Sequence, residues 1–180
     1  MNPVRELSRQ MTNSVGDHFK AMHRVMKYCV VYPERGWTLW PKGTWNGDKD
    51  FEFVVRGRSD SDYAKCPDTR RSVSGFVTYL MDVLISAKSV MQKIVALSVT
   101  EAELIAGVMC VQDMLYIMRV LESVGLKVKK PMVLEMDNRG AYDLANNWSV
   151  GGRTRYVESK QFYLRDLKEE GTLKIERIPG

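Results

Sequence analysis

The sequence predicts an α/β domain in which a mixed, five-stranded sheet is flanked by helices. Three observations predict this fold class. Strand-like segments are grouped between residues 51 and 89, a long helix with apolar residues at helical spacing follows them, and short strands and helices alternate after residue 130. The order β-β-β-α-β-α-α-β is typical of helices packed on the faces of a sheet.

The composition is that of an ordinary folded domain. The chain has 180 residues, 44% hydrophobic and 27% charged, which is enough for a core and unlike a disordered chain. A formal charge of +5 favours an anionic partner such as nucleic acid. Cys29, Cys66 and Cys110 form no C-x-x-C pair, which argues against zinc and disulfides and for an intracellular, reducing compartment (cytoplasm or nucleus). No signal peptide or membrane-length apolar run is recognisable, so no membrane partner is expected.

The first predicted element is a helix over residues 14–32. Ser14 is expected to be its N-cap, and apolar residues recur at helical spacing along it. Pro33 and Gly36 are expected to end it.

A boundary is expected after this helix. The stretch W-T-L-W (37–40) predicts a short strand, and the loop 41–50, rich in Gly, Lys and Asp, divides an N-terminal connection segment (1–50) from the main domain (51–180). Two roles are open for the tryptophans of this region, packing against the main domain or a protein interface; they are Trp37, Trp40 and Trp45.

The main domain is expected to begin with an antiparallel meander. Its strands are predicted near 51–60, at 73–81 and at 83–89, the last two joined tightly around Asp82.

A long helix is predicted over residues 99–124. Gly125 follows it at the position where glycine commonly ends a helix. The apolar residues that define its buried face are Leu104, Val108, Val111, Leu115, Met118 and Leu121.

Four short elements complete the prediction. They are a strand at 131–137, a helix at 138–147, a helix at 156–169 and a strand at 172–178.

Three acidic residues occupy positions that can converge. Asp60 ends the first strand of the main domain, Asp137 ends the strand at 131–137, and Glu103 lies in the first turn of the long helix. Functional groups of α/β sheets gather beyond strand ends, and Asp60 and Asp137 become neighbours if their strands pair in parallel.

Carboxylates without histidine or cysteine suit Mg²⁺ or Mn²⁺. Two such ions, about 3.5–4 Å apart, assist phosphodiester cleavage in known nucleases. The alternative is structural, because acidic residues are common at strand ends and helix starts. Position alone leaves both interpretations open.

Four segments carry a family resemblance. They are SDSDYAKCPDTRRSVSGFVTYL, VALSVTEAELIAG, MDNRGAYDLANN and RTRYVESKQFYLRDLKEEG, in this order. Together they resemble the ribonuclease H domain of copia-type (Ty1/copia) retrotransposon polyproteins, which has S-D-x-D…R-R-S-x-S-G, A-L-S-S-T-E-A-E, D-N and R-T-K-H-I-D motifs. The N-terminal segment is similar to the connection from the reverse transcriptase. The resemblance covers nearly the whole chain and implies a ribonuclease H-like fold.

The resemblance assigns roles to the three acids. Asp60 matches the first Asp of S-D-x-D, Glu103 the second Glu of T-E-A-E, and Asp137 the Asp of D-N. It implies that they hold two Mg²⁺ or Mn²⁺ ions and that the substrate is the RNA strand of an RNA–DNA hybrid. Asp62 is not expected to bind the metal directly; it is expected to lie behind the metal ligands or in solvent.

Substrate contacts are expected from four residues near these motifs, which are Ser98, Thr100, Asn138 and Arg139. Hydroxyl and amide groups can contact the 2′-OH of RNA, but helix capping explains the polar ones equally well. Arg70 and Arg71 have two interpretations, a turn with ion pairs near Asp68 or contact with a phosphate.

The sequence also departs from the family pattern. Tyr63 replaces a tryptophan, and Tyr156, Val157 and Glu158 replace the H-I-D triplet. The family supplies a fourth carboxylate after the last strand, and this sequence ends before that motif. Glu158 is not expected to replace it, because it lies on an earlier helix.

Two functions are therefore open. The first is a metal-dependent ribonuclease H, whose activity is impaired if the fourth acid is required. The second is a domesticated, non-catalytic module of ribonuclease H fold that binds partner protein chains in a larger assembly.

Overall fold

The computed structural model describes residues 3–36, 39–40, 45–146 and 155–179, and side chains of the last range from residue 159 onward. The chain divides into two compact units, Met1–Leu39 and Trp40–Gly180. This division lies before the boundary predicted between residues 50 and 51. The assignment of residues 1–50 to a connection segment and of residues 51–180 to the main domain stays a prediction.

The N-terminal unit contains two helices, α1 (Pro3–Ser8) and α2 (Gly16–Val31). Neither helix has a fully buried side chain, and together they line an apolar groove of about 500 Å³. The predicted helix is confirmed as α2, but its expected N-cap is wrong. Val15 is the N-cap, and the His18 Nδ1 accepts a hydrogen bond from the Val15 N–H at 3.0 Å. The short helix α1 was not predicted.

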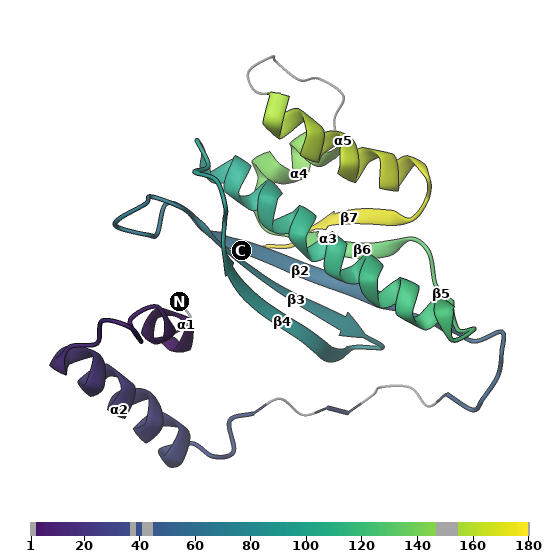
Figure 1. The fold of residues 1–180 in the computed structure, drawn as a ribbon. Coiled ribbons are helices and arrows are strands. Elements are labelled where there is room, and N and C mark those ends of the chain that lie inside the picture. The colour runs from purple at the N-terminus through teal and green to yellow at the C-terminus, as the bar shows by residue number, and fades with distance from the viewer. Residues whose placement is uncertain (1–2, 37–38, 41–44, 147–154, 180) are drawn as a thin grey trace. The chain divides into compact units, whose positions relative to one another are not determined.

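The second unit is built on a five-stranded sheet in the order β4-β3-β2-β6-β7 (Figure 1). Its strands β2, β3 and β4 form the predicted antiparallel meander. Strand β6 pairs in parallel with β2, and β7 pairs in parallel with β6. The sheet is therefore mixed, as predicted. The strand bounds are β2 Val55–Asp62, β3 Val73–Leu80, β4 Val83–Met91, β6 Met132–Met136 and β7 Leu173–Arg177.

The single strand predicted near 51–60 is in fact two. Glu52–Phe53 (β1) pairs with Lys127–Val128 (β5) in a separate two-stranded sheet, and β2 begins at Val55. The strand predicted at W-T-L-W lies partly outside the described residues, and Leu39 and Trp40 are in no strand.

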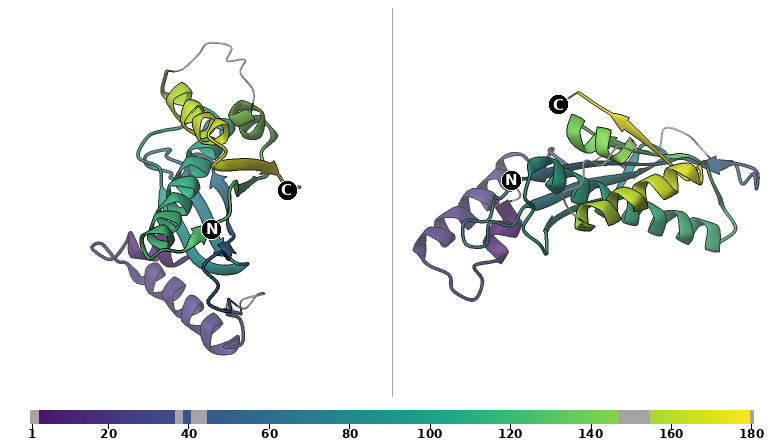
Figure 2. Two further views of the ribbon diagram at one scale, coloured as in Figure 1. Left: turned by 90° about the vertical axis from the view of Figure 1, so that its right-hand side faces the viewer. Right: turned by 90° about the horizontal axis from the view of Figure 1, so that it is seen from above.

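Three helices pack on the main sheet and on one another (Figure 2). They are α3 (Val99–Ser123), α4 (Arg139–Asn146) and α5 (Arg155–Glu169). The predicted face of α3 is buried except for the partly buried Leu121. The helix ends as predicted, since Gly125 has a φ of +81°. By length and composition α3 would suffice to cross a bilayer, but it is mostly buried, as expected of a core helix.

A buried carboxylate fixes α3 against the meander. Asp113 accepts hydrogen bonds from the Thr78 hydroxyl at 2.9 Å and from the Lys88 ammonium. Burial alone would raise the pKa of Asp113, but these bonds and one from Ser86 hold that pKa below its usual value. The pairing therefore helps to hold the middle of α3 against β3 and β4.

Close contact between α3 and β2 depends on Gly57. A Cβ at this position would lie 2.4 Å from the Cys110 Sγ and 2.7 Å from the Met114 Sδ. We expect Gly57→Ala to lower the free energy of unfolding by about 1–3 kcal/mol, because overpacking displaces the helix. Urea unfolding measures it. Gly75→Ala is the matched control, since its nearest contact would be the Asp60 carbonyl at 3.8 Å; equal losses in both variants would contradict the packing argument.

Candidate metal centre

The parallel register of β2 and β6 brings two of the predicted acids together. The last aligned pair of these strands is Ser59 and Met136, so the next residues along each chain, Asp60 and Asp137, lie side by side. Asp60 is still within β2, where it pairs with Gly75 of β3, whereas Asp137 follows the end of β6. The parallel pairing that the sequence left conditional is therefore present. Asp60 is exposed and Asp137 half-buried.

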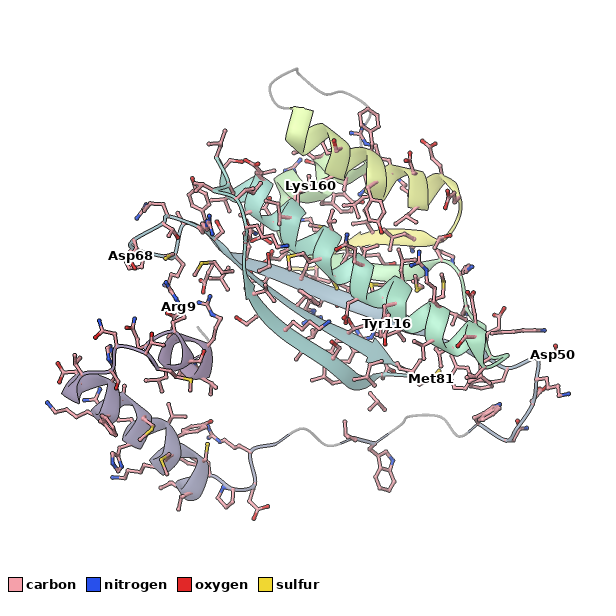
Figure 3. The ribbon with its side chains drawn as sticks, viewed as in Figure 1. Arg9, Asp50, Asp68, Met81, Tyr116 and Lys160 are labelled. Carbon is pink, nitrogen blue, oxygen red and sulfur yellow. The ribbon has the colours of Figure 1, made fainter. Side chains whose placement is uncertain are left out.

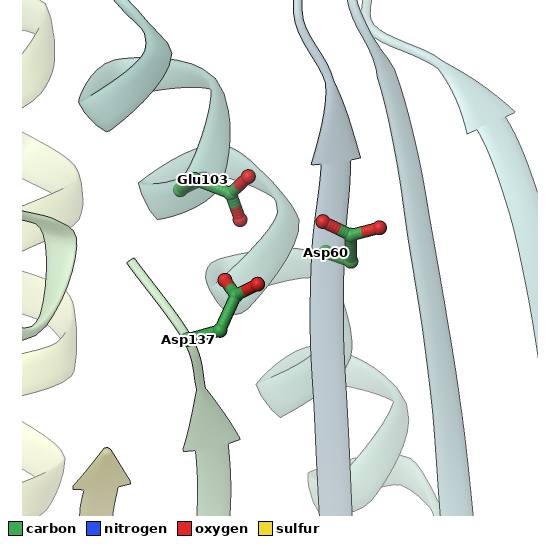
Figure 4. A group of neighbouring side chains, drawn as sticks. All are labelled: Asp60, Glu103 and Asp137. Atoms are coloured by element: carbon green, nitrogen blue, oxygen red, sulfur yellow. The ribbon is translucent and has the colours of Figure 1, made fainter. Parts of the chain in front are cut away.

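Glu103 reaches the same place from the first turns of α3, as Figure 4 shows. Carboxylate oxygens of Asp60, Glu103 and Asp137 all lie within 4.8 Å of one another. The three side chains come from a strand, a helix and a strand end, so the cluster exists only in the folded chain. The structure thus brings together all three acids that the sequence predicted.

Glu103 is held in an unusual environment for a carboxylate. It is only 4% exposed, and its Oε1 accepts hydrogen bonds from the Ser61 N–H at 3.1 Å and the Ser61 hydroxyl at 2.8 Å. Its Oε2 is buried and has no hydrogen-bond partner. A buried acceptor without a donor is costly, and a cation would satisfy it.

The pKa of Glu103 reflects these surroundings. Burial raises it to about 7; the hydrogen bonds from Ser61 oppose this rise, and the charges of Asp60 and Asp137 add to it. Oxygen donors of this kind suit hard divalent cations such as Mg²⁺ or Mn²⁺, so the donor set and the unpaired oxygen fit a metal.

Ser61 was not predicted as a site residue. It lies between Asp60 and Asp62 in the S-D-S-D stretch, and its N–H and hydroxyl both contact Glu103 on α3. The alternation of side chains along a strand does not mark Ser61 by itself, because only the position of α3 shows that Ser61 meets Glu103.

The predicted substrate residues surround the helix N-termini. The Ser98 hydroxyl accepts the Glu101 N–H at 3.1 Å, and the Asn138 Oδ1 accepts the Ala141 N–H at 2.9 Å. Both residues are therefore helix caps, as the structural interpretation proposed. Their roles in substrate binding stay predictions.

Thr100 and Arg139 lie on the two helices that meet at the site. A Cβ at Gly140 would be 2.7 Å from the Thr100 Oγ1, which shows how closely the starts of α3 and α4 approach. Arg139 is 79% exposed and lies 3.6 Å from Asp143. Glu158 is on α5, but its side chain lies outside the described part of the chain.

Comparison with known proteins identifies related sequences. No family model matches the chain. A retrovirus-related Pol polyprotein from transposon TNT 1-94 of Nicotiana tabacum is 30% identical over 178 residues, and one from transposon RE2 of Arabidopsis thaliana is 28% identical over 175 residues. Each match covers 97% of this chain and 12% of the relative. The chain is therefore similar, over nearly its whole length, to one part of these transposon Pol polyproteins.

This Pol-related chain spans only about an eighth of the length of those relatives. Among solved structures, the crystal structure of LC11-RNase H1 in complex with an RNA/DNA hybrid is similar, with a TM-score of 0.51 and 14% identity. That match covers 69% of this chain and 85% of the other. The predicted ribonuclease H-like fold is therefore confirmed.

Proposed function

We propose that the chain is a metal-dependent nuclease that hydrolyses the RNA strand of RNA–DNA hybrids. The observation that carries the proposal is the convergence of Asp60, Glu103 and Asp137, with a buried Glu103 oxygen that lacks a donor. The homologous Pol polyproteins and the hybrid-bound LC11-RNase H1 support the choice of substrate.

The three carboxylates would hold Mg²⁺ or Mn²⁺, with two ions expected. A divalent cation supplies charge that stabilises the leaving oxygen and activates a water in phosphodiester hydrolysis. Ser61 holds one oxygen of Glu103 in place, which leaves Oε2 for the cation. Asp60 on β2 and Asp137 just beyond β6 present their carboxylates from neighbouring strands, so the sheet preorganises these two ligands.

We also propose how the substrate is selected. The hydroxyl of Thr100 and the amide nitrogen of Asn138 would contact the 2′-OH that distinguishes RNA from DNA; the Asn138 oxygen is already occupied by the N-terminus of α4. Arg139 would contact a phosphate. A reducing intracellular compartment is part of the proposal, since no disulfide links the three cysteines.

The deciding experiment is cleavage of a hybrid that is labelled on either strand. We expect the wild-type chain to cut the RNA strand with Mg²⁺ or Mn²⁺, to leave a DNA duplex intact and to stop when the metal is chelated. Asp60→Asn should reduce the rate by about 1,000-fold, because several kcal/mol of charge stabilisation depend on the ligand set. If wild type and Asp60→Asn are equally inert, the enzyme proposal fails and the non-catalytic module becomes the better account.

A further inference from the structure

A basic loop continues directly from the strand that carries Asp60. Residues 63–72 join β2 to β3 and contain Lys65, Arg70 and Arg71 but one acidic side chain, Asp68. In Figure 3, Asp68 lies at the outer part of this loop, which projects beyond the ends of the two strands. With a rise of about 3.3 Å per residue, the loop begins about 10 Å from Asp60.

The positive charges of this loop differ from those of the neighbouring strand. Among the residues that the structure describes, Lys65, Arg70 and Arg71 make no ion pair. The predicted ion pair of Arg70 or Arg71 with Asp68 is therefore not found in this part of the chain. The arginines of the adjacent strand differ, because Arg56 and Arg58 both bind Glu135, at 3.1 and 2.8 Å. The loop therefore concentrates positive charge that the fold leaves available to an anion.

The backbone of the loop is ordered by internal bonds. The Arg70 N–H donates to the Cys66 carbonyl at 2.8 Å, and the Cys66 N–H donates to the Arg71 carbonyl at 3.1 Å. Ser72 is fully buried, and its hydroxyl accepts the Ala64 N–H at 3.0 Å. Arg70 has a φ of +55° and Ala64 a φ of +47°; such conformations in residues other than glycine are often kept at functional sites.

The position of the loop complements the acid cluster. Three carboxylates repel a phosphodiester strand, so a nuclease that cuts beside them must hold the strand through cations nearby. Along one strand of a duplex, phosphates follow one another about every 3.4 Å of helix axis, so the loop begins about three nucleotides from the acids. Arginine binds phosphate through two parallel N–H donors.

We propose that loop 63–72 binds the sugar–phosphate backbone of the nucleic acid through Lys65, Arg70 and Arg71, a few nucleotides from the acid cluster. This inference rests on the proposed function for its ligand, an RNA–DNA hybrid. The contact is with phosphates, so it is independent of base sequence.

The test measures binding without cleavage. In the full chain carrying Asp60→Asn, fluorescence anisotropy with a labelled hybrid gives the dissociation constant over a series of salt concentrations. The logarithm of the association constant falls as the logarithm of the salt concentration rises. Arg70→Asn and Arg71→Gln are each expected to reduce the magnitude of this negative slope by about 1, because each removes one phosphate contact. Asparagine at position 70 tolerates the positive φ, so the loop should keep its conformation. Arg70→Lys should restore most of the slope.

Lys129→Gln is the matched control. Lys129 is exposed and precedes β6, at the opposite end of that strand from Asp137. The salt dependence of hybrid binding by Lys129→Gln should therefore equal that of the parent chain. Slopes for Arg70→Asn and Arg71→Gln that also equal the parent's would overturn the inference, even if the wild-type chain cuts the hybrid. A reduced slope in a chain without cleavage would keep the inference and remove the nuclease proposal. A chain that binds no hybrid would overturn both.

Discussion

Cleavage of the RNA strand is expected to fall about 1,000-fold when Asp137 is replaced by asparagine, since each 1.4 kcal/mol of lost charge stabilisation costs a factor of ten. Asparagine keeps the size of the side chain and removes its charge. The Asp137 carboxylate is one of three that each place an oxygen within 4.8 Å of the others, so the substitution removes one charge of the cluster itself. Single-turnover cleavage of a labelled hybrid measures the change.

Asp62→Asn is the matched control for this prediction. Asp62 lies on β2 two residues beyond Asp60 and is half-buried, but it is not part of the acid cluster. We expect the Asp62→Asn variant to cut the hybrid at nearly the wild-type rate. In calorimetry it should bind Mn²⁺ like the wild type, whereas the Asp137→Asn variant should bind Mn²⁺ more weakly. Equal losses from both substitutions would mean that general acidity, and not the cluster, supports cleavage.

The acid cluster was predictable from sequence because its members belong to separate motifs with recognisable surroundings. Asp60 lies near the end of β2, Glu103 near the start of α3 and Asp137 just after β6, and the family resemblance linked them. The position that needed the structure was the register, since only the parallel pairing of Ser59 with Met136 makes Asp60 and Asp137 neighbours. Periodicity likewise predicted the long helix α3, whose apolar face is wide and regular.

Features that depend on non-local contact were missed. Ser61 supports Glu103 across two elements far apart in the sequence, and no local pattern marks such a contact. The strand predicted near 51–60 splits because β1 pairs with β5, a segment of two residues that lies beyond the long helix. Ser14 has a favourable residue type for an N-cap, but α2 begins after Val15, where His18 provides the bond. Residue propensity indicates a helix start only to within a residue or two.

Glu103→Gln is expected to stabilise the metal-free protein at pH 8 while leaving its stability at pH 4 nearly unchanged. The pKa of Glu103 is about 7 in the folded protein, against an ordinary value of 4.5. The folded state therefore binds this proton more tightly than the unfolded state does. The stability that this provides is fully present below pH 4.5 and is lost as the pH rises through 7. The upper limit of the loss is about 3 kcal/mol, because each tenfold change in proton affinity is worth about 1.4 kcal/mol. Glutamine has no such titration, and its Oε1 still accepts both Ser61 bonds.

Urea unfolding of both proteins at several pH values, without metal, measures this difference. The two histidines are common to both chains, so their titration cancels in the comparison. Saturating Mg²⁺ or Mn²⁺ should then stabilise the wild type at pH 8, because the ligand binds only the folded state, and should stabilise Glu103→Gln much less. Stability curves that stay parallel from pH 4 to pH 8 would show that Glu103 ionises as an ordinary carboxylate, and the buried oxygen would no longer argue for a cation. Curves that diverge and are brought together by metal would identify Glu103 as the residue whose ionisation is coupled to metal binding.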